Sequence, residues 1–335
     1  MPFIREFNTL LYDSCNNVIY IDLNNGITFS IYDSSLNLIS KKQIYKNKSS
    51  FVTCHFDIDS NDIVYGLITS GTNELQYVSI VNKYCIKNTI LKYNPYENTI
   101  KFPYVKKSNE YINLFYYLIN KTTPHNCSLV HKYNIHDKWY EYIIDNINYD
   151  ILTNFRIINT SSHVLVFYFN LCDTNEELFM KCFDFKKNIW SSPYQLTFTN
   201  NSKMYLSVIK DNTDCYHITY SENNSGQYHC CYINGYTDFK KFNININRIF
   251  TKCIACTFPT VLYYNKTLYI QWMEYNVLNS VKSYDNGETW NTPTIDPASV
   301  NNNFSCCRFG ANINNNNIIY SFFNQKGFIN VLGIR

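Results

Sequence analysis

The cysteines are the residues of this chain whose spacing first suggests chemistry. Cys253 and Cys256 form a C-x-x-C pair, and Cys306 and Cys307 are adjacent further along the chain. Four thiolates held close together can bind zinc. Adjacent residues of a strand point to opposite faces, however, so only one of Cys306 and Cys307 can face such a site. We therefore interpret these thiols, and the Cys230-Cys231 pair, as small buried apolar side chains.

The other titratable residues do not favour a metal, a cofactor or nucleic acid. The seven histidines show no H-x-x-x-H or H-x-H spacing. Charged residues make up 16% of the chain and the net charge is only +3, without an arginine-rich run or a basic helix. Lysine pairs do recur, and we interpret them as protection of exposed outer strands against intermolecular pairing. They are Lys41-Lys42, Lys106-Lys107, Lys186-Lys187 and Lys240-Lys241.

The segment Ser283 to Trp290 reads S-x-D-x-G-x-x-W, which suits a tight turn between antiparallel strands. Asp285 can accept from backbone N–H groups just ahead of it, and Gly287 can adopt the positive φ that such a turn needs. Trp290 can fold beneath the turn as an apolar plug. The segment resembles the Asp-box, or BNR repeat, of sialidase-like β-propellers. In that family the motif lies on an outer hairpin, away from the active site, so it implies a fold and not an activity.

Weaker copies of this turn recur along the chain. Walking back from Asp285, an Asp or Asn appears about every 50 residues, each followed closely by an aromatic or aliphatic residue. These positions are Asn234, Asp184, Asn134, Asn82 and Asp33. A period near 50 residues is typical of a repeat architecture such as a propeller.

Each period also contains a short apolar run rich in tyrosine, upstream of the Asx position. Val164 to Phe169 and Leu268 to Met273 are examples, and Ile318 to Phe323 is the last of seven such runs. Their β-branched and aromatic residues, with little polar alternation, predict strands buried on both faces. A strand before each run and two after it would make a four-stranded blade. The sequence therefore predicts an all-β fold, a β-propeller of four-stranded antiparallel blades.

Seven runs predict seven blades in a single domain over residues 1–335. The expected blades are residues 7–46, 50–92, 99–145, 152–197, 203–246, 255–294 and 303–335. The last blade lacks room for a fourth strand, which residues 2–6 could supply by closing the ring. The alternative is a six-bladed propeller with a terminal extension, since the sialidases that this chain resembles have six blades.

The resemblance also implies a chemistry, which the arginines only partly support. Sialidases hold a substrate carboxylate with three arginines, and the first belongs to an Arg-Ile-Pro motif that this chain lacks. Arg5 has a similar early position without that motif. Arg156 and Arg308 fall on or beside predicted innermost strands, and Arg248 falls in a predicted loop. Because bidentate Arg–carboxylate pairing suits such a site, these three arginines are the candidate clamp.

A sialidase also uses a tyrosine nucleophile activated by a glutamate. Glu222 and Glu274 follow predicted inner strands, with Tyr220 and Tyr275 beside them. Either Tyr–Glu pair is a hypothetical ligand or catalytic site. The alternative is that all four are ordinary polar residues at the rim of the funnel.

Three functions follow as hypotheses. The first is a non-catalytic propeller that binds a glycan or a protein partner through its funnel face, or serves as an assembly scaffold, because loops rich in Asn, Ser, Thr and Tyr suit such surfaces. The second is a sialidase-like exo-glycosidase. The third is a self-assembling coat or surface component.

The chain offers few signals of location. Its N-terminus lacks the pattern of a signal peptide and no apolar stretch is long enough to span a membrane. Thirteen cysteines without a signal peptide indicate a reducing compartment. We therefore expect a cytoplasmic protein, or alternatively one on the surface or coat of a particle or spore.

Overall fold

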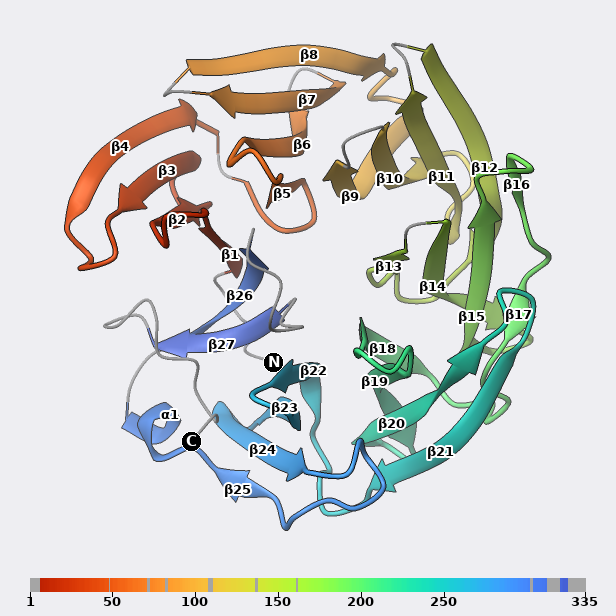
Figure 1. Ribbon diagram of the computed structural model, residues 1–335. Helices are drawn as coiled ribbons and strands as arrows, with labels where there is room; N and C mark the ends of the chain where they lie inside the picture. Colours follow the sequence, from red (N-terminus) through yellow and green to blue (C-terminus); the bar gives the residue numbers. More distant parts are fainter. Residues whose placement is uncertain are drawn as a thin grey trace. The chain divides into compact units, whose positions relative to one another are not determined.

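The computed structural model describes residues 7–47, 49–70, 73–81, 84–107, 111–135, 138–160, 162–301, 304–311 and 320–324. The chain divides into two compact units. The first comprises residues 3–147 and 305–315, and the second comprises residues 148–304 and 316–335. Figure 1 shows the strands of both units in chain order.

The first unit contains three antiparallel sheets, each built from four consecutive strands. The strands are β1 (Phe7–Tyr12), β2 (Val18–Asp22), β3 (Ile27–Tyr32) and β4 (Leu38–Tyr45); β5 (Cys54–Ile58), β6 (Val64–Ser70), β7 (Glu74–Val81) and β8 (Tyr84–Lys92); and β9 (Asn98–Lys107), β10 (Tyr111–Asn120), β11 (Asn126–Ile135) and β12 (Lys138–Asn148). A further strand, β26 (Phe304–Ala311), pairs in parallel with β1.

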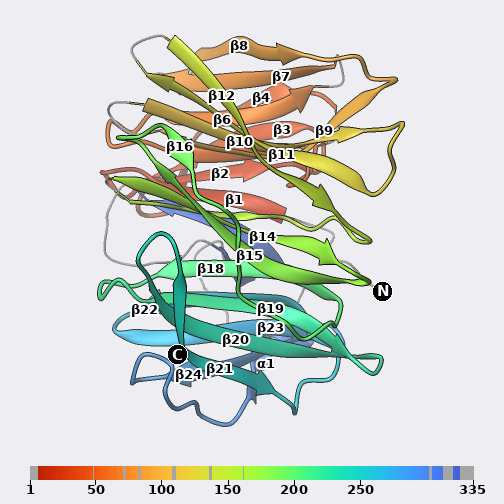
Figure 2. The same cartoon turned by 90° about the vertical axis from the view of Figure 1, so that its right-hand side faces the viewer.

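The second unit also contains three sheets. Their strands are β13 (Arg156–Asn159), β14 (His163–Cys172), β15 (Asn175–Asp184), β16 (Ile189–Trp190) and β17 (Tyr194–Gln195); β18 (Lys203–Lys210), β19 (Tyr216–Asn224), β20 (Gln227–Thr237) and β21 (Phe242–Phe250); and β22 (Thr257–Tyr264), β23 (Thr267–Glu274), β24 (Val277–Ser283) and β25 (Thr294–Ile295). A short helix, α1 (Pro297–Asn301), and β27 (Tyr320–Asn324) follow. Figure 2 shows strands β18 to β21 of this unit one below the other.

Burial explains why the apolar runs became second strands. All residues from Val164 to Phe169 on β14 are buried, and Leu165, Phe167 and Phe169 pack against β18 and β19 of the next sheet of this unit. The fourth strand β12 instead alternates exposed and partly buried residues. Each fully buried aromatic side chain contributes roughly 1.5–3 kcal/mol relative to an exposed one. The prediction of four-stranded antiparallel blades is confirmed.

A proline interrupts the fourth strand of the blade that begins with β13. β16 and β17 both pair with β15, and Pro193 lies between them. Proline has no backbone N–H to donate, so it cannot continue a sheet ladder. The fourth strand of this blade is therefore split into two short pieces.

The prediction of seven blades is wrong, because the described residues form six blades, three in each unit. The expected seventh blade, residues 303–335, does not form a sheet of its own in the described part. Its first strand, β26, instead pairs with the open edge of β1, with Phe7 opposite Cys306 and Tyr12 opposite Ala311. An unpaired strand edge is a template for another strand, and this edge is satisfied from within the chain. The closing strand expected at residues 2–6 lies outside the described residues.

Helices have almost no part in the structure. In the described ranges the one helix is α1, with five residues, so no helix there could cross a membrane.

Candidate functional site: a basic cluster on the first strands

Three strands of the first unit bring opposite charges together. Asp57 on β5 accepts a hydrogen bond from the Lys106 ammonium on β9, with Nζ and Oδ2 2.9 Å apart. The Arg308 guanidinium on β26 lies 3.4 Å from the same Oδ2. Two cations therefore share one carboxylate, and β5, β9 and β26 position them.

An aromatic pair lies beside these charges. The rings of His55 and Tyr104 are 4.2 Å apart, and the Arg308 guanidinium lies 5.9 Å from the Tyr104 ring centre. The backbone N–H of Val105 donates to His55 Nδ1 at 3.1 Å. Because Nδ1 accepts, the proton of the neutral imidazole belongs on Nε2. We call His55, Asp57, Tyr104, Lys106 and Arg308 the basic cluster.

A second ion pair extends the basic cluster along the same strands. Lys107 donates to Asp59 at 2.6 Å, and its backbone N–H donates to the Tyr65 hydroxyl at 3.0 Å. This pair is neutral in sum, so the excess positive charge stays with Lys106 and Arg308.

Burial and charge act in opposite directions on Asp57. Burial alone would raise the pKa of this carboxyl group, but the positive charges of Lys106 and Arg308 outweigh it and the pKa is lowered. The side chain of Asp57 is 4% exposed and that of Arg308 9%, whereas 40% of the Lys106 side chain is exposed. The cluster therefore presents positive charge to solvent through Lys106, with Arg308 behind it.

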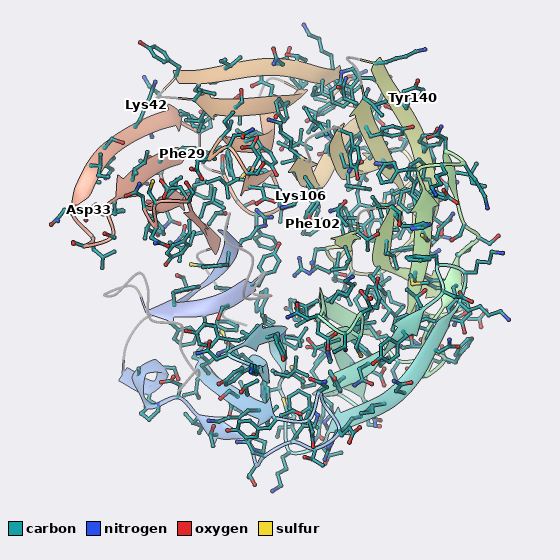
Figure 3. The ribbon with its side chains drawn as sticks, in the orientation of Figure 1. Phe29, Asp33, Lys42, Phe102, Lys106 and Tyr140 are labelled. Carbon is teal, nitrogen blue, oxygen red and sulfur yellow. The ribbon has the colours of Figure 1, made fainter. Side chains whose placement is uncertain are left out.

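The basic cluster corrects one sequence interpretation. The pair Lys106-Lys107 was expected to protect an outer strand, but it lies on the first strand of its blade and pairs with buried carboxylates. Lys42, by contrast, does lie exposed on the fourth strand β4, as Figure 3 shows for both lysines. A lysine pair is the same sequence signal in both places, and only the strand order separates the two roles.

The three arginines of the candidate clamp have different surroundings. On the first strand β13, Arg156 donates through Nε to the Leu206 carbonyl at 2.7 Å, and its guanidinium lies 4.1 Å from the Tyr320 ring centre. Arg248 is exposed on the fourth strand β21 and not in a loop as expected. The described contacts of the second unit do not join these two, and Arg308 belongs to the first unit. The clamp therefore stays a hypothesis.

Tyr220 and Glu222 lie on β19 but not at an exposed rim. Tyr220 is 2% exposed within a hydrophobic cluster, and Glu222 is 4% exposed. The Lys203 ammonium lies 3.5 Å from Glu222 and 2.9 Å from Glu177, and all three side chains are almost completely buried. A second strand is covered on both faces, so these residues form a buried ionic network.

Glu274 and Tyr275 point in different directions. Glu274 accepts from the Ile254 backbone N–H at 3.0 Å. Tyr275 lies in the turn after β23 with φ +50°, and 73% of it is exposed. The turn directs the tyrosine to solvent and leaves the glutamate to cap the neighbouring segment.

The segment Ser283 to Trp290 forms the turn that its sequence indicates, between β24 and β25. The Ser283 hydroxyl donates to Asp285 Oδ1 at 2.7 Å and accepts from the Gly287 N–H at 2.8 Å. Asp285 also accepts from the Thr289 N–H at 2.9 Å, and hydrogen bonds from Thr289 and Ser283 lower its pKa to about 2. Gly287 has φ +93°, and the Trp290 indole donates to its carbonyl at 3.0 Å.

The expected phase of the repeat is only partly right. Asp33 and Asp184 do lie in third-to-fourth-strand turns, where each accepts backbone N–H groups. Asn234 instead lies within β20, four residues before the turn, which Asp238 caps. A bulge after Asn234 lengthens this strand and shifts the turn. Asn82 lies outside the described residues.

A second repeated turn was missed. Asp13, Asp59 and Asp211 each follow a first strand and accept from the N–H groups two and four residues ahead. The fourth residue of each turn has positive φ, and it is Asn16, Asp62 or Asp214. The pattern Asp-x-x-Asn/Asp could have revealed it, because both residue types suit such turns.

The cysteines gather differently from the expected set. Cys256 lies within hydrogen-bonding reach of the thiols of Cys230 and Cys253, and all three belong to one apolar cluster of the second unit. Burial raises the pKa of the Cys256 thiol well above its ordinary value. Cys306 and Cys307 belong to the first unit. The interpretation as buried free thiols fits this surrounding.

Comparisons with known proteins identify the fold. No protein-family model and no curated protein matches the sequence. Among solved structures, an ulvan lyase of polysaccharide lyase family PL25, bound to -[GlcA(1-4)Rha3S]-, is similar with a TM-score of 0.62 and 10% identity over 98% of this chain and 93% of that chain.

Two further structures match over most of this chain. An α-L-arabinofuranosidase from Fusarium graminearum has a TM-score of 0.53 and 11% identity, over 83% of this chain and 94% of that chain. A prolyl endopeptidase has a TM-score of 0.54 and 8% identity, over 89% of this chain and 43% of that chain. At such low identity these likenesses show the β-propeller fold alone. They do not identify the chain as sialidase-like.

Proposed function

We propose that this protein is a β-propeller that binds an anionic glycan through the basic cluster, without transforming it. The observation that carries the proposal is the sharing of Asp57 by Lys106 and Arg308 beside the Tyr104 ring. Asp57 and Lys106 stand on the first strands β5 and β9, and Arg308 stands on β26, which pairs with the first strand β1. A site held on strands is more precise than one held on loops.

The cluster matches the chemistry of an acidic sugar. A uronate carboxylate or a sulfate group needs cationic donors, and Arg308 and Lys106 supply a planar fork and a point charge. Tyr104 adds an aromatic face with a polar tip, which suits the mixed surface of a sugar ring. Asp57 holds both cations in place, so the site is preorganised before the ligand arrives.

Two of the similar structures act on sugars, and one of them holds an acidic saccharide. This likeness of fold supports a carbohydrate ligand without naming it. The runner-up is a protein partner at the same face, because loops rich in Asn, Ser, Thr and Tyr suit such a surface too.

The test is a glycan array that contains uronate-bearing, sulfated and neutral glycans, followed by calorimetry with the best acidic ligand. We expect binding to acidic glycans that weakens with added salt. Lys106→Ala and Arg308→Gln should each weaken it about tenfold or more, because a hydrogen bond to a charged group is worth about 1.5–3 kcal/mol.

Lys42→Ala is the matched control. Lys42 is an exposed lysine on β4, a fourth strand, whereas the basic cluster lies on β5, β9 and β26. It should leave the affinity unchanged. Equal losses in Lys42→Ala and Lys106→Ala, or binding of neutral glycans only, would sink the proposal.

A second candidate, an eliminating enzyme that acts on a uronate, rests on Tyr104 beside Arg308. Tyr104 would be the base, because His55 Nδ1 already accepts the Val105 N–H and the other ring nitrogen carries the proton. Removal of a proton α to a carboxylate needs a positioned base and a cation on the carboxylate. Incubation with acidic polysaccharides would reveal it as a rise in ultraviolet absorbance from the unsaturated product. A sialidase-like exo-glycosidase ranks lower, because it would need Arg156, Arg248 and Arg308 to share one carboxylate.

A further inference from the structure

A different set of side chains in the second unit forms a compact ligand group. Asp211 follows β18, Cys215 comes four residues later, directly before β19, and His217 comes six residues later, on β19. One ligand atom from each lies within 4.8 Å of the others, and the three residues are 3%, 3% and 0% exposed. We propose that Asp211, Cys215 and His217 bind a zinc ion.

The spacing follows from the turn and the strand. Residues two positions apart along extended chain point to one side, so Cys215, directly before β19, and His217, on β19, point to the same side. The turn brings Asp211 back over that face. Asp211 Oδ1 accepts from the Thr213 N–H and hydroxyl, both at 2.8 Å, and from the Cys215 N–H at 2.9 Å. Oδ1 is therefore committed to the turn, and Oδ2 is the atom that faces the ligand group.

The distance between Oδ2 and the histidine fits a metal. His217 Nε2 lies 3.2 Å from Asp211 Oδ2. Zinc bonds nitrogen and carboxylate oxygen at about 2.0–2.1 Å, so two tetrahedral ligands of this kind stand about 3.3 Å apart. A carboxylate, an imidazole and a thiolate are all common zinc ligands, and a water molecule would complete the four.

The surroundings of His217 resemble those of a metal ligand. Its other ring nitrogen, Nδ1, lies 2.7 Å from the Tyr232 hydroxyl. A ligating histidine nearly always donates its other ring N–H to an acceptor. The Tyr232 oxygen can be that acceptor, which leaves Nε2 of His217 for the metal. Tyr232 also contacts the Asn234 amide, whose buried Oδ1 has no hydrogen-bond partner among the described residues.

Two other turns of the same kind show which part of this arrangement serves the turn and which part could bind a metal. Asp13 and Asp59 cap turns of the same kind, but the residues four and six positions later are Asn17 and Ile19, and Ile63 and Tyr65. The turn therefore forms without a thiol or an imidazole. Among these three turns, that of Asp211 is the one followed by both groups. Binding releases the proton of the Cys215 thiol to solvent and leaves the thiolate on the metal, so affinity should rise with pH.

The site has a structural consequence. The Tyr232 hydroxyl lies directly beneath Gly287, and Asn234 donates to the Asn286 carbonyl at 3.0 Å. The metal would fix Tyr232, and through it the turn of residues 283–290. Zinc should therefore raise the melting temperature of the protein and not switch on an activity.

The experiment uses the full chain stripped of metal with a chelator. Zinc content after dialysis gives the stoichiometry, and titration with Co²⁺ reports a thiolate ligand by its charge-transfer absorbance. We expect one zinc per chain and a rise in melting temperature. Cys215→Ser and His217→Gln should weaken binding more than about 100-fold, since even outer partners such as Tyr232 contribute about 10–100-fold.

Two controls keep the outcome unambiguous. Asp13→Asn alters a turn of the same kind without a thiol or imidazole, and Cys253→Ser removes a thiol from the other cysteine group. Both should leave zinc binding intact, and circular dichroism checks that each variant folds. No metal on the folded wild-type chain would overturn the proposal. So would charge transfer that survives Cys215→Ser and disappears in Cys253→Ser, because the metal would then belong to the other cysteines.

Discussion

At the scale of single residues, the structure distinguishes groups that the sequence presents as alike. Lys42 and Lys106 both belong to Lys-Lys pairs, yet one is exposed on a fourth strand and the other bonds a buried carboxylate. Gly226 and Gly287 both have positive φ in turns, yet their surroundings differ completely. The consequences of substitution therefore depend on neighbours that lie far away in sequence.

Gly287→Ala should destabilise the protein more than Gly226→Ala. Both glycines have φ near +90°, but a Cβ on Gly287 would lie 2.1 Å from the Tyr232 hydroxyl oxygen, whereas one on Gly226 meets nothing within 4 Å. We expect a loss of about 1 kcal/mol at Gly226, from backbone strain alone, and about 2–4 kcal/mol at Gly287. Urea denaturation measures both. Equal losses would contradict the close packing beneath the turn.

Asp57→Asn should lower stability most at neutral pH. The pKa of Asp57 is lower in the folded chain, because the charges of Lys106 and Arg308 outweigh its burial. A lowered pKa contributes stability above the unfolded value of about 3.9, and that stability is lost as the pH falls through the folded value. We expect a loss of about 1–3 kcal/mol at pH 7, since Lys106 is partly exposed. The difference from wild type should shrink below about pH 4.

Denaturation at several pH values checks this, with Asp33→Asn as the control. Asp33 caps an exposed turn through an oxygen that asparagine retains, as its position in Figure 3 illustrates. A deficit of Asp57→Asn that stays constant from pH 7 to pH 3 would contradict the ion-pair assignment.

At the scale of elements, charges hold strands of neighbouring blades together. In the second unit Lys203 on β18 contacts Glu177 on β15 and Glu222 on β19, and its side chain is 0% exposed. The Thr199 hydroxyl and the Asn201 amide also donate to Glu222, at 2.9 and 3.1 Å. These bonds replace the water that the carboxylate loses on burial.

Lys203→Met should cost about 3–5 kcal/mol, because it leaves two buried carboxylates without a cation. The triple variant Lys203→Met, Glu177→Gln, Glu222→Gln should recover most of this loss, since no uncompensated charge remains. Chemical denaturation of the single and triple variants measures the difference. A triple variant no more stable than the single one would show that packing, and not charge, dominates at this position.

At the scale of the whole molecule, the chain returns late in sequence to its first strand. β26 pairs with β1 over six residues and carries Arg308 to Asp57 within the first unit. Gly310 permits the approach, because a Cβ there would lie 2.7 Å from Leu11 and 3.0 Å from Asp57.

Gly310→Val should therefore displace β26, lower the melting temperature by several degrees and weaken glycan binding, because Arg308 moves with the strand. The expected cost is about 1–3 kcal/mol from overpacking. Ser305→Ala, on the same strand, is the control. A thermal melt together with the glycan titration tests both effects, and an unchanged affinity in Gly310→Val would separate Arg308 from the ligand.

The sequence by itself determined the fold class, the approximate length of a blade and the form of one turn. Buried strands need β-branched and aromatic residues, and tight turns need Asp, Asn and Gly, so these patterns are local and can be read from adjacent residues. The second strands and the segment Ser283 to Trp290 were predicted for this reason. Arg308 was predicted for a different group, a clamp with Arg156 and Arg248, and that clamp stays a hypothesis.

Only the tertiary structure decided the number of blades and the partners of the charged residues. β26 joins β1 because that edge is open, and edge pairing between residues 299 positions apart leaves no local pattern. Tyr220 and Glu222 looked like rim residues until the neighbouring sheet covered them. His55, Lys106 and Arg308 became one cluster because β5, β9 and β26 converge, and charge pairing depends on distances that the sequence does not contain.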